Sequence, residues 1–516
     1  MVPQKSMILD CDPGIDDALA ILMAMGADEI DLKAITLSYG NTNIENVTKN
    51  LFTILHMLAK EVDPARLATI SNQALRARLE RISKKRPVIA VAEVHEACSV
   101  HSDKESIVDL LAERPEQGSN FLAYANVVCV VAGTGTLGLP YALAMGGWIG
   151  AAILVISLIM TIYTGVLLMK CLYYNGKYRL SSYHEVGRHA FGKIGLIAVW
   201  FFHTSIVLGA PIMYLILSGT EIYTLAKASA PSISEKEWIW ISTAIVALPF
   251  VAMKTLREVA VMSIFGALAT VFLVICTIRG SIVSMAEPGY VQPSHDVIIW
   301  ANLPATIASI SICYGGNVVY MHVEEAMRYP RSWNRVLAAA LTTCAVMYLA
   351  TAIPGYLAYG VDSKSPILQS LPQDTFTKVG TVMIIIHVIL AAPILLTSFA
   401  LEFERLTDIT VARRGKMMEF VYRTISRLAL VAVCGFIAFI VPYFAEFLTL
   451  LGALGNVSLI FIMPILFYWK LFGWRTMKVP ELVWCGFILI VGFVSMVIGT
   501  IDAVKGLAAA FNKGSA

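Results

Sequence analysis

The chain has 516 residues, of which 57% are hydrophobic and 15% are charged, and its net charge is +3. Ordinary soluble domains carry about 25% charged residues, so this composition argues against a wholly soluble protein and indicates a membrane protein. So small a net charge gives no support to nucleic-acid binding. The nine cysteines are scattered without a Cys-x-x-Cys pair, which argues against a metal site or a disulfide framework.

The first predicted element is a short β-α-β unit. An apolar strand at 7–12 (MILDCD) runs into a Pro-Gly turn and a helix, and a second strand at 32–38 ends at a Gly-Asn pair. A third strand is predicted at 87–92. Carboxylates that follow a strand beside a glycine turn suit a hard cation and sugar hydroxyls. We therefore predict a small, incomplete α/β fragment over residues 1–92.

The motif DCDPGIDD, with the Gly-Asn pair after the second strand, resembles the amino-terminal part of inosine–uridine-preferring nucleoside hydrolases. The motif residues are Asp10, Asp12, Asp16, Asp17 and Asn41. The resemblance implies a water-activating base and calcium ligands among the aspartates, with Asp16 and Asn41 on the ribose. That family also needs a late aspartate and a late histidine, for which no room is left before the membrane spans. The fragment is therefore predicted to be inactive, either as a vestigial fusion or as the product of a mis-joined gene.

Residues 93–120 are predicted to be a mobile, charged cytosolic linker. About eleven apolar runs follow, each long enough to cross a hydrocarbon core of about 30 Å. We place the spans at 121–143, 148–171, 194–219, 238–256, 259–284, 299–321, 335–359, 376–400, 423–441, 444–470 and 481–503. The transmembrane domain is thus expected over 121–505, with a short C-terminal tail at 506–516.

The connecting segments fix an expected orientation. With a cytoplasmic N-terminus, most of their lysines and arginines fall on the cytoplasmic side, as the positive-inside rule requires. One span more or fewer would break this alternation. The C-terminus is then expected to be exoplasmic or lumenal.

The first span contains Gly133-Thr-Gly-Thr-Leu-Gly-Leu-Pro140, which a continuous helix tolerates poorly. Freed backbone groups must still find partners in lipid, so an unwound stretch that lines a polar cavity is predicted. Close packing of small residues is the simpler alternative. The sixth span has a second break at Tyr314-Gly-Gly-Asn317, and two breaks five helices apart are typical of inverted-repeat transporters.

The stretch GTGTLGLPYALAMGG, together with the end of the sixth span, VEEAMRYP, resembles the amino acid/auxin permease superfamily. The resemblance implies an all-α, polytopic protein with the leucine-transporter fold, which is a five-plus-five inverted repeat with an eleventh helix. It also implies a substrate site at the two breaks. The implied site residues are Gly133, Thr134, Gly135, Thr136, Gly138, Tyr314, Gly315, Gly316 and Asn317, with Tyr214 and Ser398 as candidates for the side-chain pocket.

Ionisable groups inside a membrane are candidates for proton coupling. They are His203 on the third span, Glu221 at its outer end, His322 and Glu324 at the end of the sixth, His387 on the eighth and Glu446 on the tenth. Glu324, Glu325 and Arg328 suit a cytoplasmic gate equally well. The resemblance implies coupling to protons, and Thr397 and Ser398 on the eighth span could bind sodium as the alternative coupling ion.

We therefore predict a secondary active transporter, a symporter for neutral amino acids. It should need no cofactor, catalytic residue or metal, and its partners should be an amino acid and the lipid bilayer, not nucleic acid. Two alternatives are an amino acid sensor with little flux and a membrane-anchored nucleoside hydrolase. The sequence leaves open the amino acid, the oligomeric state and whether the protein resides in the plasma or the vacuolar membrane.

Overall fold

The computed structural model describes residues 5–11, 30–37, 111, 113–115, 117–176, 178–252, 259–407, 409 and 411–514. The chain divides into two compact units, Met1–Ser106 and Ile107–Ala516. In the first unit, β1 (Lys5–Cys11) and β2 (Ile30–Leu37) pair in parallel, with Met7 opposite Leu32 and Asp10 opposite Thr36. Two of the three predicted strands are thus present. The predicted helix between them and the strand at 87–92 lie outside the described residues, so the α/β fragment as a whole stays a prediction.

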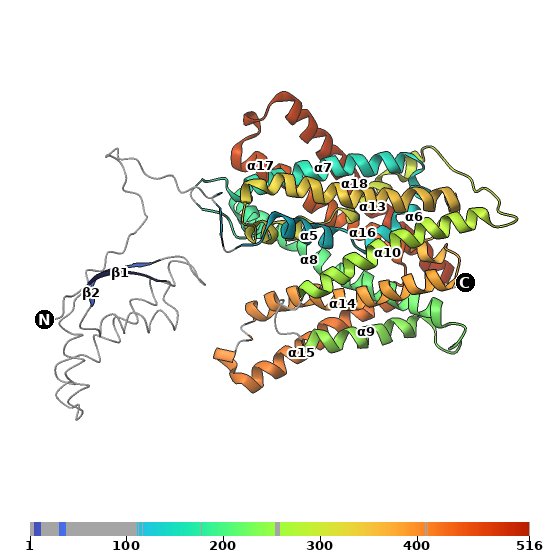
Figure 1. Cartoon of the computed structure of the whole chain (residues 1–516), viewed down its shortest axis with the longest axis horizontal. Coiled ribbons are helices and arrows are strands. Elements are labelled where there is room, and N and C mark those ends of the chain that lie inside the picture. The colour runs from blue at the N-terminus through green and yellow to red at the C-terminus, as the bar shows by residue number, and fades with distance from the viewer. Residues whose placement is uncertain are drawn as a thin grey trace. The chain divides into compact units, whose positions relative to one another are not determined.

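The second unit is a bundle of helices (Figure 1). In chain order they are α5 (Asn120–Val131), η1 (Thr134–Gly138), α6 (Leu139–Gly146), α7 (Ile149–Leu172), α8 (Tyr183–Ala226), α9 (Glu235–Ala252), α10 (Val259–Ala286), η3 (Trp300–Asn302), α11 (Leu303–Cys313), α12 (Asn317–Glu325), η4 (Pro330–Ser332), α13 (Trp333–Tyr359), η5 (Gly360–Asp362), η6 (Ile367–Gln369), α14 (Thr375–Leu406), α15 (Val411–Ile440), α16 (Phe444–Leu451), the π-helical η7 (Gly452–Asn456) and η8 (Ser458–Ile462), α17 (Met463–Phe472), η9 (Trp474–Thr476) and α18 (Val479–Gly514).

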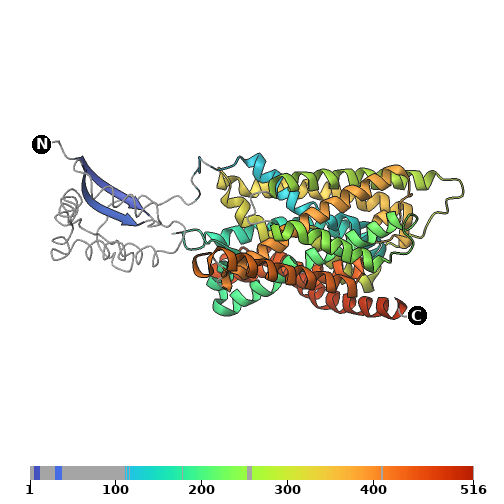
Figure 2. The ribbon, with the colours of Figure 1, turned by 90° about the horizontal axis from the view of Figure 1, so that it is seen from below.

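Most of these helices run along a common direction, as the second view also shows (Figure 2). Among the described residues, eight helices are long and apolar enough to cross a membrane, or nine if the bent pair around η1 counts as one span. The prediction of a helical, multi-pass membrane protein is therefore confirmed. Helix α9 and the short helices α11 and α12 fall outside that count, so eleven spans remain a prediction.

Two element ends differ from the sequence prediction. Helix α8 begins at Tyr183, well before the predicted span, and turns sharply at Gly192, whose φ of 62° favours glycine. The turn lays the first part of α8 against the part that follows, where Gly187 and Gly195 meet. Helix α18 continues to Gly514, so most of the predicted tail is helical.

The buried side chains form two packed clusters. The first joins α5, α6, α7, α11, α12, α13, η8, α17, α18 and the start of α8. The second joins the rest of α8 with α9, α10, α14, α15 and α16. Leu137 of η1 belongs to the second cluster and Leu139, two residues later, belongs to the first. The segment around η1 therefore lies where the two cores meet.

A buried ion pair ties the second cluster together at one end. The Arg427 side chain on α15 is fully buried, and its Nε lies 2.8 Å from Oε1 of Glu404 on α14. Its Nη1 also donates to the carbonyl oxygen of Phe250 on α9. Burial of the Arg427 charge is tolerable because it is paired with Glu404.

Candidate functional site

The first break lies between α5 and η1. Helix α5 ends at Val131, and the chain is extended at Ala132 and Gly133 before the 3-10 turn of η1. The two arms of this span are bent by 42°. The amide and the hydroxyl of Thr136 both donate to the Gly133 carbonyl, at 3.2 and 2.8 Å. Pro140 falls in the first turn of α6, where its missing N–H costs no helical hydrogen bond. The predicted break is therefore present.

The second break separates α11 from α12. Helix α11 ends at Cys313, and α12 begins at Asn317. Between them, Gly315 donates to the Ile312 carbonyl and Gly316 donates to the Tyr314 carbonyl, so the chain turns tightly without continuing the helix. Both breaks predicted from glycine placement are thus present.

The two breaks touch each other. A Cβ on Gly135 would lie 2.9 Å from Sγ and 3.3 Å from Cα of Cys313, so only glycine lets η1 approach the end of α11 this closely. The contact brings together two segments that lie about 180 positions apart in the sequence and in which no side chain is charged. The two breaks therefore lie side by side, an arrangement that the sequence could only suggest.

Open space adjoins the first break. A Cβ on Gly133 would find nothing within 4 Å. Gly133, Gly135 and Gly315 are partly exposed, although Thr134 and Thr136 beside them are buried. Partial exposure of glycine backbone inside a bundle marks a cavity edge. The open space beside Gly133 is thus bordered by the extended backbone of the first break.

Side chains from other helices complete the surroundings. Tyr214 on α8, predicted for the pocket, lies with its side chain beside that of Thr134. Thr270 on α10 lies with its hydroxyl 3.3 Å from the Ala132 carbonyl. On α14 the Ser398 hydroxyl donates to Ile394 of its own helix, and the buried Thr397 hydroxyl has no partner among the described residues. The structure therefore brings Tyr214 to the break, while it shows no contact of Ser398 with either break.

Two further predicted residues are held by neighbouring helices. The Tyr314 hydroxyl donates to the Leu154 carbonyl on α7, at 3.0 Å. The buried Asn317 donates to the Leu459 carbonyl of η8, and its Oδ1 has no partner among the described residues. Gly138 packs against Leu448 of α16.

Sequence reasoning missed two residues at the breaks. Asn456 at the end of π-helical η7 donates to the Ser311 carbonyl, and its Oδ1 packs against Gly315. Its polarity within an apolar span was the available signal, and π-helical turns are frequent at functional sites. Tyr348 on α13 lies with its hydroxyl 2.7 Å from the Val131 carbonyl and 2.6 Å from the Cys313 carbonyl. Nothing in its sequence context distinguishes it from a core aromatic residue.

The titratable candidates fall into different surroundings. His322 is exposed on α12, and Glu446 is half-buried on α16, with its side chain against Gly506 of α18. His387 on α14 packs against Gly266 of α10, and His203 stacks edge-on with His184 at 4.8 Å. In the described part of the chain, the side chains of Glu446, His387 and His203 contact residues outside the two breaks.

Glu221 stands apart from those four. Its side chain is only 1% exposed, and its Oε1 has no hydrogen-bond partner among the described residues. It faces a second carboxylate, Glu235 of α9, and lies beside Gln369 of η6. Glu235 itself accepts a hydrogen bond from Thr220 at 2.7 Å. Because η6 packs against η1, the environment of Glu221 is connected to the first break.

Glu324 lies in an ion-pair network that closes one end of the bundle. Its Oε2 is 2.8 Å from Nε of Arg179, and its Oε1 is 3.4 Å from Nη2 of Arg114. The Tyr173 hydroxyl donates to the same carboxylate. The Glu324 side chain is 1% exposed, whereas Glu325 is 58% exposed and 3.6 Å from Arg179. Arg328 pairs with Glu113 at 2.7 Å and not with Glu324.

The segment before the first span takes part in this closure. The Arg114 amide donates to the Arg328 carbonyl, the Gly118 amide donates to the Ala326 carbonyl, and the Arg328 amide donates to the Gly118 carbonyl. These bonds form a small parallel bridge between Gly118 and Met327. The predicted mobile linker therefore ends in a paired segment, because the turn after α12 offers backbone groups to Arg114 and Gly118.

The opposite end of the bundle is covered by a loop. The amides of Trp148 and Ile149 donate to the carbonyls of Asp296 and Val297, and the Ile299 amide donates to Gly146. The Trp148 ring packs on His295 and Tyr356. The loop before η3 is thus held against the end of α6 and the start of α7.

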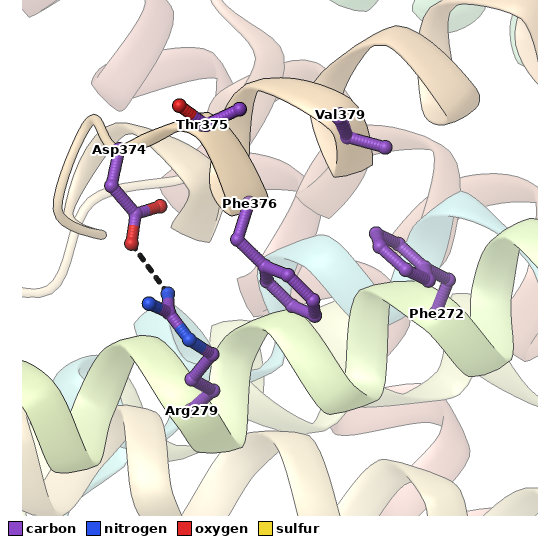
Figure 3. A pocket seen from close by; sticks show the side chains of 6 residues that line it. All are labelled: Phe272, Arg279, Asp374, Thr375, Phe376 and Val379. Atoms are coloured by element: carbon purple, nitrogen blue, oxygen red, sulfur yellow. Dashed lines mark hydrogen bonds and ion pairs between the residues drawn. The ribbon is translucent and has the colours of Figure 1, made fainter.

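A pocket of about 630 Å³ lies away from the breaks, between α10 and the start of α14 (Figure 3). Arg279 reaches across it to Asp374 at 2.5 Å, and its guanidinium lies over the Phe376 ring. The Thr377 amide and then the Arg279 guanidinium hold the pKa of Asp374 below its ordinary value. No predicted site residue lines this pocket.

The hydrolase motif is only partly described. Asp10 lies in β1. Asp12, Asp16, Asp17 and Asn41 lie outside the described residues, so their predicted roles stay predictions.

Two families match the chain. The family "Transmembrane amino acid transporter protein" matches residues 116–505. The family "Inosine-uridine preferring nucleoside hydrolase" matches residues 7–126. Both resemblances predicted from the sequence motifs are thus confirmed.

Two curated relatives are proteins of Arabidopsis thaliana. Amino acid transporter AVT1D is 27% identical over 412 residues, which cover 78% of this chain and 73% of that protein. Amino acid transporter AVT1H is 28% identical over 442 residues, covering 81% and 96%. Among solved structures, Mhp1, a nucleobase-cation-symport-1 family transporter in a closed conformation with bromovinylhydantoin bound, aligns with a TM-score of 0.42 and 12% identity over 78% of this chain and 95% of that one.

Proposed function

Because the chain belongs to the transmembrane amino acid transporter family, we propose that it carries neutral amino acids across a membrane by proton-coupled secondary active transport. The observation that carries the proposal is the contact between the two breaks, with open space at Gly133. The matched relatives named as amino acid transporters support the substrate class.

The amino acid backbone would be held by the main chain of the breaks. The free amide groups at the start of η1 and α12 suit its carboxylate, and carbonyls of the unwound segments suit its ammonium group. Thr134, Thr136 and Tyr214 add hydroxyl groups beside the same space. The two break segments carry no charged side chain, so a charged substrate side chain would find no partner there, which favours neutral amino acids.

The proposal also includes the arrangement of the spans and their motion during transport. Eleven spans would form a five-plus-five inverted repeat with a cytoplasmic N-terminus. The two packed clusters would rock against each other about η1 and expose the space beside Gly133 to each side in turn. The Glu324 network would be the gate on the cytoplasmic side. The N-terminal fragment would be inactive, and the protein would reside in the plasma or vacuolar membrane.

Among the coupling candidates, Glu221 is the one that the surroundings favour as the proton carrier. A buried carboxylate with an unpartnered oxygen, facing a second carboxylate, is costly to keep charged, and binding a proton removes that cost. Gln369 would pass the change to η6 and so to the first break. Sodium at the unpartnered Thr397 hydroxyl is the alternative coupling device.

Uptake of radiolabelled amino acids into proteoliposomes tests the proposal. We expect saturable uptake of a neutral amino acid by the wild type that an inward proton gradient drives and a sodium gradient does not. Glu221→Gln, which keeps the shape but cannot bind the proton, should lose the gradient-driven part and retain exchange of internal for external amino acid.

Glu446→Gln is the matched control, since Glu446 is the half-buried carboxyl of another span. Loss of gradient-driven uptake in Glu446→Gln, with uptake by Glu221→Gln still driven by the gradient, would identify Glu446 as the proton carrier. Saturable binding without any flux in folded wild-type protein would point to a sensor instead.

A further inference from the structure

One tyrosine hydroxyl joins the ends of both interrupted helices. Tyr348 is on α13, its side chain is fully buried, and its hydroxyl oxygen lies 2.7 Å from the Val131 carbonyl and 2.6 Å from the Cys313 carbonyl. Val131 is the last residue of α5, and Cys313 is the last residue of α11. The hydroxyl therefore lies where the C-terminal ends of the two half-helices converge.

Such a point attracts positive charge. Each helix C-terminus carries about −0.5 elementary charge, from carbonyl groups without helical partners. In interrupted membrane helices, converging half-helix C-termini and unwound carbonyls are ligands for a monovalent cation. Here the point holds a neutral hydroxyl.

The hydroxyl supplies only part of what a cation would supply. It has one proton to donate, while both carbonyl oxygens lie within hydrogen-bonding distance. It can therefore satisfy the two carbonyls only by sharing or alternating that proton. Unlike an ion, it is tethered to α13 and cannot be exchanged with either side of the membrane.

The tyrosine ring is held in place independently of the breaks. It packs edge-on against the Tyr314 ring at 5.5 Å, and the Tyr314 hydroxyl is fixed by the Leu154 carbonyl of α7. Helix α13 also packs against α5, which places the ring beside both half-helices. The hydroxyl is thus aimed by packing and not by the hydrogen bonds alone.

We propose that the Tyr348 hydroxyl takes the place of a monovalent cation between the ends of α5 and α11, so that transport by this chain needs no cation at that point. The inference rests on the proposed transport function. Tyr348 is a positioning residue: it holds the carbonyl ends of the two breaks together and acts on substrate only through them.

The test is sodium dependence after removal of the hydroxyl. Tyr348→Phe keeps the ring and leaves the two carbonyl ends facing each other without a donor. We expect its proteoliposome uptake in choline chloride to fall at least roughly tenfold, the effect of about one buried hydrogen bond to a carbonyl, and to recover partly in sodium chloride. Wild-type uptake should be the same in both salts.

A second readout does not require transport. The melting temperature of purified Tyr348→Phe should rise by roughly 3 °C or more when sodium chloride replaces choline chloride, because an ion bound only by the folded state stabilises it. The wild type and Tyr356→Phe should show no such rise. Tyr356 is the matched control: it is equally buried on α13, and its hydroxyl bonds to the Asp296 backbone, away from the breaks.

The outcomes separate the two claims. No uptake by the wild type, with a sodium-induced rise in the melting temperature of Tyr348→Phe, would overturn the proposed transport function and support the cation replacement. Uptake by the wild type, with Tyr348→Phe as insensitive to sodium as Tyr356→Phe in both readouts, would overturn the cation replacement. Tyr348→Leu, which leaves more room between the carbonyls, decides the question in the same way if Tyr348→Phe is recovered only as aggregate.

Discussion

Replacing Gly135 by leucine is expected to lower amino acid uptake by at least roughly 100-fold, the effect of displacing a reacting or binding group by about 1 Å. The first side-chain carbon alone would approach Sγ and Cα of Cys313 to 2.9 and 3.3 Å. The Cα belongs to the backbone at the end of α11 and cannot rotate away. A larger side chain must therefore push the two breaks apart. The initial rate of uptake into proteoliposomes, per folded protein, measures the effect.

Gly486→Leu is the control for this substitution. It introduces the same side chain on α18, where a Cβ would meet nothing within 4 Å. Its uptake should stay close to that of the wild type. Uptake by Gly135→Leu within about threefold of Gly486→Leu would show that the contact between the breaks does not matter for transport.

The second large effect is expected for Glu324→Gln. Breaking a buried ion pair by neutralising one partner costs about 3–5 kcal/mol, because Arg179 and Arg114 then lose the charge that balances them. The closed arrangement of residues 114–118, α12 and the turn before α8 loses that stabilisation. We expect the bundle to open at this end more often.

Alkylation of native Cys313 reports the opening. This thiol is buried at the end of α11, where η1 covers it. N-ethylmaleimide should modify it at least roughly tenfold faster in Glu324→Gln, since 1.4 kcal/mol corresponds to a factor of ten in population. Glu325→Gln is the matched control, because the neighbouring carboxylate is exposed and 3.6 Å from Arg179. Equal alkylation rates in both variants and the wild type would contradict a gate at Glu324.

The sequence predicted the breaks because glycine and proline act locally. Three glycines and Pro140 within eight residues cannot continue a helix at low cost, whatever surrounds them. The start of α6 at Leu139 and of α12 at Asn317 follow from the same local rule. The helical fold class could be predicted from the sequence for a similar reason, because the thickness of the bilayer fixes how long an apolar run must be to cross it.

Residues that act through contacts between helices could not be identified from the sequence in this way. Tyr348 is one aromatic residue within an apolar helix, and only the fold brings the ends of α5 and α11 to its hydroxyl. Arg114 lies in a stretch that reads as a charged linker, and only the turn after α12 gives it backbone partners. Ser398, chosen by its position on the eighth span, bonds within its own helix. Local chemistry is readable from sequence, whereas pairing across helices depends on the folded arrangement.

The central claim is that a transported amino acid occupies the space beside Gly133. Labelling of Gly133→Cys with a small methanethiosulfonate reagent, followed by mass spectrometry that separates residue 133 from native Cys129, tests it most directly. A side chain at this position points into open space, so the variant should fold and react. An amino acid that the wild type transports, at ten times its Kd, should slow the labelling roughly tenfold. Gly486→Cys should be unaffected. Labelling of Gly133→Cys at an unchanged rate in the saturating amino acid would contradict a substrate site between the two breaks.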